Sequence, residues 1–201
     1  MRIRTPRLLI RCWSEADAPL LIEAIAANLE YLRPWLPWVV HEPQPLDRKV
    51  ALLRSFRRRF EAGEDFIYGL FTPDEKTVVG GAGLHRRIGA GAIEIGYWVH
   101  VDHVGQGLAT EASAALARVG FGPMGLQRIE IHCEPANAAS SAVAAKLGFV
   151  HEVTIPGCVT SPTMDPRDMM IWSMGRDDFK TSPAAAVEIE ALDHEGLPLP
   201  L

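Results

Sequence analysis

Cysteine is scarce in this sequence. The 201 residues hold only three cysteines, at positions 12, 133 and 158, which are isolated from one another. An odd number of scattered cysteines excludes a disulfide framework and supplies no zinc-ligand spacing. Apolar runs are too short to span a bilayer, and arginines interrupt the first apolar stretches, so neither a membrane span nor a signal peptide is predicted. We therefore expect a cytoplasmic protein with no metal and no membrane partner.

An excess of positive charge is absent as well. Lys and Arg number 20 against 25 Asp and Glu, which gives a net charge of -5 and a pI of about 5.8. A nucleic-acid-binding protein usually carries a basic face, so this balance argues against nucleic acid and leaves a basic peptide or an amine as partner. The hydrophobic share of 48% and the charged share of 22% are ordinary for a globular protein, and the length suits one domain.

The most informative stretch runs from residue 93 to residue 110. Apolar side chains at every second position predict a half-buried strand: Ile93, Ile95, Tyr97, Val99 and Val101. The sequence Gly-Gln-Gly at 105–107 ends this pattern, and an alanine-rich helix follows. A glycine loop that opens a helix is suited to binding a phosphate, because the first turn has unpaired N–H groups and the positive end of the helix dipole. A tight turn that merely requires glycine is the alternative.

The rest of the pattern predicts short strands and four helices. Strands are expected at residues 8–10, 66–72, 78–87, 93–101, 128–134, from 149 onward, and 169–174. Helices are expected at residues 14–32, 47–62, 110–121 and 138–147. The three strands between 66 and 101 are joined by short turn segments, which predicts an antiparallel meander.

The last 25 residues differ in composition from the rest. We predict one domain at 1–176 and a C-terminal tail at 177–201, which holds a triple alanine and several acids and ends in GLPLPL. Such a composition buries little surface, so the tail is expected to be flexible or loosely docked. Val187, Ile189 and Ala191 alternate with acidic residues, so an added edge strand or a contact with another subunit is the alternative.

Two motifs combine with the order of the elements. The first is a strand, then VGQGLA, then a helix; the second is a strand, then Asn137-Ala-Ala-Ser140, then Lys146-Leu-Gly-Phe149. Together they resemble the GNAT family of acetyl-CoA-dependent N-acetyltransferases. The segments TPRLLIR, YLRPWLPW, IEIGYWV and RDMMIW resemble its RimJ/RimL-type branch. The resemblance spans residues 5 to about 175. It implies an α+β fold, with about four helices flanking a mixed, mostly antiparallel seven-stranded sheet that splays open between residues 93–101 and 128–134.

The resemblance also implies a reaction: an acetyl group passes from acetyl-CoA to a primary amine by direct attack. A protein N-terminus, an amino acid and another small amine are the acceptors left open. Acetyl-CoA is expected in the splayed sheet, with its pyrophosphate on the loop at 104–109. The residues expected to contact it are Trp98, Val99, Val101, Val104, Gly105, Gln106, Gly107, Leu108, Ala109, Thr110, Asn137 and Ser140. Val104 stands where the family carries Gln or Arg.

The candidate catalytic residues are Glu94 and Ser140. Glu94 is a charged residue in a strand fit for burial, and it matches a glutamate that sequences of this branch often carry at that position. It is the candidate general base, expected to act through water; its alternative is a side chain that faces solvent. Ser140 is the candidate acid for the leaving thiolate, because the family's usual tyrosine position holds Ala144; its alternative is a local backbone hydrogen bond. A main-chain N–H near Trp98 or Val99 is expected to stabilise the oxyanion.

Other roles remain open between alternatives. Asn137 is both a helix N-cap and, by resemblance, a pantetheine ligand. The acceptor is expected to be lined by residues 28–45, 153–168 and the tail. Substrate contacts are predicted for Trp35, Trp38, Glu94 and Tyr97, although the tryptophans have the alternative of closing the core beneath a loop.

The sequence also bears on metal binding and on alternative functions. His100, Asp102 and His103 lack a matched second pair of ligands, so no metal site is predicted. The absent tyrosine motivates an alternative function, a catalytically weak acyl-CoA-binding sensor, and a wider opening would accept succinyl-CoA or a longer acyl-CoA. The branch also implies a homodimer that completes the acceptor site.

Overall fold

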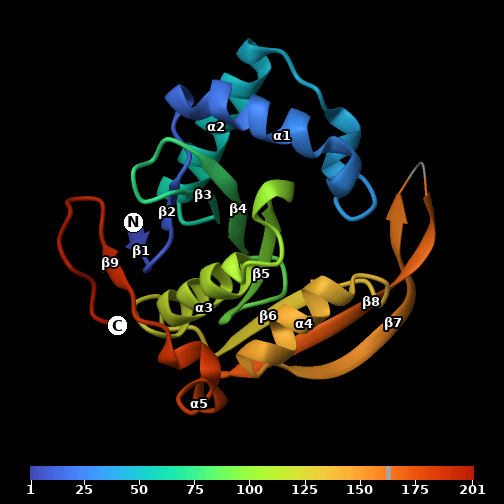
Figure 1. The fold of residues 1–201 in the computed structure, drawn as a ribbon. Helices are drawn as coiled ribbons and strands as arrows, with labels where there is room; N and C mark the ends of the chain where they lie inside the picture. Colours follow the sequence, from blue (N-terminus) through green and yellow to red (C-terminus); the bar gives the residue numbers. More distant parts are fainter. Residues whose placement is uncertain (162–163) are drawn as a thin grey trace.

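Nine strands form a single sheet in the order β7-β8-β6-β5-β4-β3-β2-β1-β9 (Figure 1). The computed structural model describes residues 1–161 and 164–201 of the chain. The strands are β1 (Arg2–Arg4), β2 (Leu9–Cys12), β3 (Asp65–Phe71), β4 (Val78–His85), β5 (Ala92–Val99), β6 (Arg128–Cys133), β7 (Val150–Ser161), β8 (Met164–Gly175) and β9 (Glu190–Leu192). Neighbouring strands are antiparallel except β5 and β6, which are parallel. The predicted α+β class with a mixed, mostly antiparallel sheet is confirmed.

Helices cover both faces of this sheet. They are α1 (Ala18–Leu32), α2 (Leu46–Glu61), α3 (Leu108–Phe121), α4 (Ala138–Leu147) and the one-turn α5 (Arg176–Phe179), with 3-10 turns η1 (Glu15–Asp17), η2 (Pro37–His41), η3 (Val101–His103) and η4 (Pro183–Ala186). α1 and α2 pack on one face, and α3 and α4 on the other (Figure 1). We call these the α1/α2 face and the α3/α4 face. No helix in the described residues is long and apolar enough to cross a membrane.

Helix α3 lies close against the sheet because its buried residues are small. Its core side is built largely from alanine, and Ala112, Ala114 and Ala115 are fully buried. These residues pack with Ile93 of β5 and Ile129 of β6 in the main hydrophobic cluster. Burial of this apolar surface is worth roughly 25 cal/mol per Å². It fixes the helix beside β5 and β6, so that its N-terminus adjoins the end of β5.

The sheet has nine strands where seven were expected. The additional strands, β1 and β9, are three residues long and lie at one edge of the sheet. Such short strands carry too few alternating positions to give a periodic signal. Other bounds differ by a few residues: Ser14 precedes η1 and α1 begins only at Ala18, while β5 ends at Val99 and not at residue 101.

The C-terminal tail packs on the core and is not loosely docked. β9 pairs with β1 antiparallel, which is the edge-strand alternative, and Ala184 and Ala191 are buried in the main cluster. Arg118 of α3 donates to the carbonyl oxygen of Ala185 at 2.6 Å. The expectation from composition was incorrect because small alanines need little surface to fill gaps beside α3. The division of the chain at residue 176 stays a prediction.

The segment 153–168 was expected to be an irregular loop, but it is largely a β-hairpin. Its described residues extend β7 to Ser161 and begin β8 at Met164, and residues 162–163 lie outside the described part. The pairing shifts register between Ile155 and Val159, near Pro156 and Gly157. Proline and glycine thus produce a local irregularity within paired strands and do not abolish the pairing.

Candidate active site

The sheet opens between β5 and β6. These parallel strands are in register at three positions, the last of which joins Glu94 to Glu130. Among the described residues no further pair follows, although β5 continues to Val99 and β6 to Cys133. We call this opening the split. Because an unpaired strand edge presents free N–H and C=O groups, the split is suited to holding an extended ligand as an extra strand.

A glycine loop joins the end of β5 to the N-terminus of α3. Gly105 and Gly107 have φ values of 74° and 78°, a left-handed conformation that favours glycine. Gly107 is the N-cap of α3, and no side chain caps the helix there. The first-turn N–H groups are therefore available to an anion, and the helix dipole adds positive potential at the same place.

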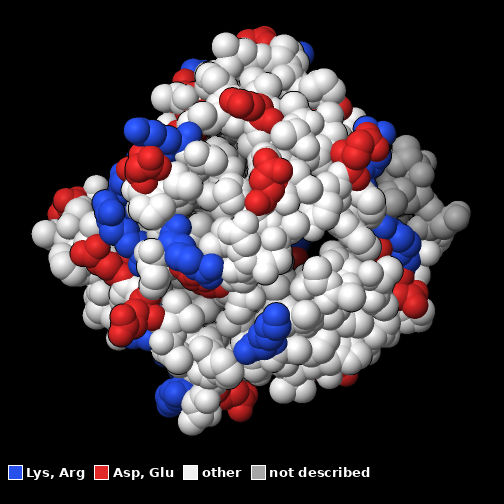
Figure 2. All heavy atoms as spheres, in the orientation of Figure 1, with Lys and Arg blue, Asp and Glu red and all other residues white. Residues whose placement is uncertain are grey.

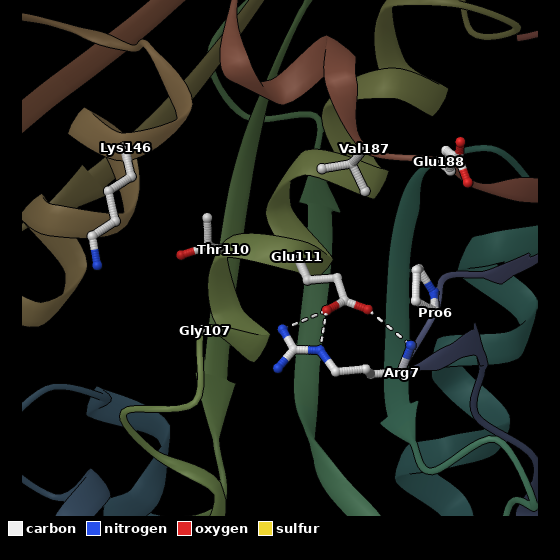
Figure 3. Close-up of a pocket in the computed structure, with 8 residues that line it drawn as sticks. All are labelled: Pro6, Arg7, Gly107, Thr110, Glu111, Lys146, Val187 and Glu188. Carbon is white, nitrogen blue, oxygen red and sulfur yellow. Dashed lines mark hydrogen bonds and ion pairs between the residues drawn. The ribbon is translucent and has the colours of Figure 1, made fainter.

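A pocket of about 480 Å³ adjoins this helix end (Figure 3). Its lining residues come from four parts of the chain: Pro6, Arg7, Gly107, Thr110, Glu111, Lys146, Val187 and Glu188. Arg7 donates to the carbonyl oxygen of Gln106 at 2.8 Å and to Glu111 at 2.6 Å, which holds the loop against α3. Figure 3 shows Arg7 and Lys146 on opposite sides of Gly107. Two cations beside an uncapped helix N-terminus suit a ligand with several phosphates.

The direction of the β5 N–H groups identifies the donor that faces the split. The N–H of His100 donates to the carbonyl oxygen of Val79 at 2.7 Å, on the β4 side. Successive N–H groups of a strand point to opposite sides, so the N–H of Val99 points toward the split. The N–H of Val101 instead donates to Oδ1 of Asn28 at 2.5 Å. Val101 was expected to continue β5 beside the ligand, but it lies in η3 with its N–H already used.

On the α3/α4 face, β5 and α4 are in contact across the split. The hydroxyl groups of Tyr97 on β5 and Ser140 on α4 lie 2.8 Å apart. Burial raises the pKa of Tyr97, although the hydrogen bond with Ser140 acts in the opposite sense, so the phenol stays protonated. Ser140 is therefore not limited to a local backbone bond. Asn137 caps α4, since its Oδ1 accepts the N–H of Ser140 at 3.1 Å, which leaves its amide hydrogens for a ligand.

On the α1/α2 face, Glu94 lies buried where the split begins. Its side chain is 6% exposed, so the solvent-facing alternative is excluded. Arg87, in the turn after β4, holds both carboxylate oxygens: its Nε donates to Oε2 at 2.6 Å and a second nitrogen donates to Oε1. The same hydrogen bonds raise the pKa of Arg87. A buried carboxylate needs such a partner, because an unpaired charge would be costly to desolvate.

His132 of β6 lies across the split from Glu94. Its Nδ1 is 3.5 Å from Oε2 of Glu94, and its Nε2 is 2.5 Å from Oε2 of Glu130. Arg128 donates to the other oxygen of Glu130 at 2.6 Å. The α1/α2 face therefore carries a connected set of charged and titratable groups around the split, which we call the acidic network: Arg87, Glu94, Arg128, Glu130 and His132.

Figure 2 shows a hollow between the half that carries α1 and α2 and the half that carries α4 and the β7–β8 hairpin, with acidic atoms inside it. Arg167 of β8 bridges the two halves: it donates to the carbonyl oxygen of Pro34 at 2.5 Å and pairs with Glu134 at 2.8 Å. The loop after α1 therefore borders the opening. Trp35 is half-buried and Trp38 is exposed, and neither belongs to the buried core. Their contact with substrate stays a prediction.

Comparison with known proteins decides the family. Residues 7–150, more than half of the chain, match the acetyltransferase (GNAT) domain. This chain belongs to the GNAT acetyltransferase family. The predicted class of activity, an N-acetyltransferase, is confirmed.

Relatives place the enzyme near the ribosomal-protein acetyltransferases. It is 31% identical over 158 residues to the ribosomal protein uS5-alanine N-acetyltransferase of Escherichia coli (strain K12), covering 76% of this chain and 79% of the relative. It is 32% identical over 103 residues to the probable N-acetyltransferase YjcK of Bacillus subtilis (strain 168), covering 50% of this chain and 56% of the relative. The resemblance to the RimJ/RimL-type branch is confirmed.

Solved structures show the same fold. Mycobacterium smegmatis RimJ in complex with CoA-disulfide aligns with a TM-score of 0.80 and 25% identity, over 92% of this chain and 90% of that protein. RimL, a ribosomal L7/L12 alpha-N-protein acetyltransferase in complex with coenzyme A, aligns with a TM-score of 0.79 and 22% identity, over 89% of this chain and 99% of that protein.

The acetyltransferase brings most of the predicted residues to one region, but on different sides of the sheet. Ser140, Asn137 and Tyr97 meet on the α3/α4 face, beside the loop at 104–109, whereas Glu94 lies on the α1/α2 face. His100 accepts from the N–H of Asp102 at 3.2 Å. In the part of the chain that the structure describes, no group of three or more His, Cys, Asp or Glu could hold a metal ion.

Sequence reasoning missed most partners of Glu94. Arg87, Glu130 and His132 received no catalytic interpretation, although a signal exists in RIEIHCE. Every second residue of that strand is polar or charged, which places Arg128, Glu130 and His132 on one face. A parallel pairing of Glu94 with Glu130 places them beside the candidate base, but this register depends on contacts that are distant in sequence.

Proposed function

We propose that this GNAT enzyme transfers an acetyl group from acetyl-CoA to the N-terminal amine of a protein. One observation carries the proposal: the split has an anion site at its mouth, beside α3, and a buried carboxylate at its closed end. An extended, phosphate-bearing acyl donor fits between these two features. The reacting amine then enters from the α1/α2 face, toward Glu94.

The described residues fit coenzyme A. The N–H groups of residues 104–109 would hold the pyrophosphate, with Arg7 and Lys146 supplying positive charge. The β5 edge from Gly96 to Val99 would bind the pantetheine arm, and the amide hydrogens of Asn137 are free to join it. When bound, acetyl-CoA supplies an activated acetyl group as a thioester. The N–H of Val99 is then positioned to polarise the thioester carbonyl.

Proton transfer divides between the two faces of the sheet. Glu94 accepts the proton of the attacking amine on the α1/α2 face, through one water. Ser140 donates a hydrogen bond to the leaving thiolate on the α3/α4 face, while the protonated phenol of Tyr97 donates to Ser140. This pair of hydroxyls supports an active enzyme over the acyl-CoA-binding sensor, because it offers a proton donor where Ala144 replaces the expected tyrosine.

The acceptor is proposed from the relatives. The uS5-alanine N-acetyltransferase matches over three quarters of both chains, which favours a protein N-terminus that begins with alanine. Trp35 and Trp38 are proposed to contact the peptide, because their loop borders the opening. A cytoplasmic location and a homodimer stay proposals of the same kind.

Two measurements test the proposed function. Acetyl-CoA, CoA, succinyl-CoA, ATP and NAD are first compared by thermal shift; a ligand at 100 times its Kd should add about 2.7 kcal/mol to the free energy of unfolding. A shift with the CoA compounds alone is expected. Peptides with N-terminal alanine are then incubated with acetyl-CoA and examined by mass spectrometry, against the same peptides with a blocked N-terminus and a free lysine.

The outcomes separate the alternatives. Acetylation of the free N-terminus alone supports the proposal. Binding of acetyl-CoA without transfer to any amine supports the sensor, and faster transfer from succinyl-CoA supports the wider acyltransferase. Failure of every CoA compound to bind a folded protein contradicts the assignment of the loop at 104–109.

A further inference from the structure

Glu94 and His132 face each other across the split, on the face that receives the amine. They come from the two strands that separate there, and the Nδ1 of His132 lies 3.5 Å from Oε2 of Glu94. His132 lies two residues beyond the last paired position of β6, so its ring borders the open part of the split. Its side chain is 19% exposed, against 6% for Glu94. Solvent therefore has better access to His132 than to Glu94.

Both oxygens of Glu94 are engaged by Arg87. A proton that arrives on either oxygen takes its second lone pair and cancels the negative charge that faces a guanidinium group which stays charged. A protonated Glu94 is thus a short-lived state, and turnover requires that the proton moves on. Among the described residues, His132 is the histidine that lies within 4 Å of this carboxylate.

We propose that His132 relays the amine proton from Glu94 to solvent, with Glu130 as its positioning partner. This inference rests on the proposed function, since it needs Glu94 to act as base. The other oxygen of Glu130 accepts from Arg128, and a carboxylate oxygen can only accept, so we assign the hydrogen of the His132 ring to Nε2, which donates to Glu130. The lone pair of Nδ1 is then directed toward Glu94.

The steps balance in atoms and charge. An N–H bond of the amine breaks as its proton passes to the intervening water, the water gives up one of its own protons to form an O–H bond on Glu94, and the proton on Glu94 then passes to Nδ1 of His132. The products of this step are a carboxylate at Glu94, again held by Arg87, and an imidazolium between two carboxylates. The imidazolium returns one proton to water, which restores the neutral ring. No oxidant, reductant or metal takes part.

The surroundings of His132 support this role. On its own strand, Glu130 faces it at 2.5 Å, and the next residue on the same face, Glu134, is paired with Arg167 of β8. From β5 it meets Glu94, whose guanidinium partner comes from the turn after β4. Its register neighbour on β8 is the uncharged Ile171. The imidazolium is therefore stabilised by carboxylates that already have cationic partners.

The chain offers a matched control one strand away. His85 of β4 is also bound to a buried carboxylate, with its Nδ1 2.8 Å from Oδ1 of Asp65, and it lies on the same face. Its ring rests over Gly83, where any Cβ would collide with it. No ion pair joins His85 to Glu94 in the described residues. It therefore shares the burial and the hydrogen bonding of His132 but not the proposed relay.

The experiment compares His132→Gln, His132→Ala and His85→Gln in the acetylation of an N-terminal-alanine peptide. We expect His132→Gln to lower kcat by about 10- to 100-fold, with the KM for acetyl-CoA unchanged, because proton transfer is affected and cofactor binding is not. The acid limb of the pH profile of kcat should change shape in His132→Gln and not in His85→Gln. Added imidazole should restore turnover to His132→Ala, since it can occupy the vacated site and carry the proton.

Two results would overturn the relay. One is a kcat of His132→Gln within about twofold of the wild type. The other is a His132→Ala variant that is folded, binds acetyl-CoA and is slow, yet does not respond to imidazole, which would mean a purely structural role. If the wild-type enzyme itself transfers no acetyl group, the proposed function fails; if it is active and the His132 variants match it, only the relay fails.

Discussion

The two faces of the split carry different kinds of side chain: neutral hydroxyl groups on one face and paired charged groups on the other. On the α3/α4 face, the neutral hydroxyl of Tyr97 meets the hydroxyl of Ser140 at 2.8 Å and the main-chain oxygen of Ser140 at 3.3 Å. On the α1/α2 face, the acidic network surrounds Glu94 with two arginines, a second carboxylate and a histidine. A donor that works as a neutral group needs no counter-ion, whereas a buried carboxylate must be paired. The difference teaches that the proposed base, which is a buried charge, needs more supporting residues than the proposed acid, which is neutral.

The largest expected effect on kcat comes from the α1/α2 face, which we call the charged face, in contrast to the α3/α4 face, which we call the neutral face. Glu94→Gln keeps the shape of the side chain but removes the proton acceptor, so kcat should fall by about 10²- to 10⁴-fold. The KM for acetyl-CoA should stay within about twofold of the wild type, because Glu94 lies on the face opposite Ser140 and Asn137. Steady-state kinetics with an N-terminal-alanine peptide measure both constants. Glu23→Gln, at an exposed position of α1, is the control.

A kcat of Glu94→Gln close to that of the wild type would end the assignment of the charged face to proton removal. Only the α3/α4 face would then take part in the reaction, and the charged groups of the α1/α2 face would have a structural role.

A smaller effect is expected on the neutral face. Ser140→Ala removes the hydroxyl that meets Tyr97, and kcat should fall by about 10- to 100-fold if that hydroxyl assists the leaving thiolate. Ser141→Ala is the matched control, since the hydroxyl of Ser141 donates to the carbonyl oxygen of Asn137 at 3.2 Å and not to Tyr97. If Ser140→Ala raises only the KM for acetyl-CoA, Ser140 is a ligand contact and the neutral face supplies no acid.

The stability of the charged face should depend on pH. Burial would raise the pKa of Asp65, but the hydrogen bond with His85 and the nearby arginines outweigh it, so the pKa of this carboxyl is lowered. A group with a lowered folded pKa contributes stability that is complete above its unfolded value near 3.9 and is lost as pH falls through the folded value.

Asp65→Asn should therefore destabilise the protein at pH 7 by about 1–3 kcal/mol, and the difference from the wild type should shrink as the pH falls below about 4. Calorimetric Tm values across this range measure it, with Glu23→Gln as the control. A difference that does not vary with pH would mean that the lost contact is a matter of packing and not of charge.

The two faces also differ in how far the sequence predicts them. The glycine loop, Ser140 and Glu94 are local motifs, and their spacing placed each on the correct element. The acidic network joins β4, β5 and β6, so Arg87, Glu94 and His132 come together only through strand register. Periodicity specifies which face a residue occupies but not its neighbour on the next strand. The tail was misjudged for the same reason, since its pairing partner β1 lies at the other end of the chain.

The smallest expected effect on kcat is that of Tyr97→Phe, and this variant tests most directly how the two faces of the split differ. Tyr97→Phe keeps the ring and removes one hydroxyl, so the loss of stability should be about 0.5–1.5 kcal/mol. Because the pKa of Tyr97 is raised by burial, its phenol stays protonated through the assay range and can donate to an oxygen of Ser140. Its role is then to orient Ser140, whose own hydrogen points to the thiolate, and kcat should fall only about fivefold, with an unchanged alkaline limb. A fall as large as that of Ser140→Ala would identify the phenol as the acid, and the neutral face would then act as a two-membered proton chain, like the pair of Glu94 and His132 on the opposite face.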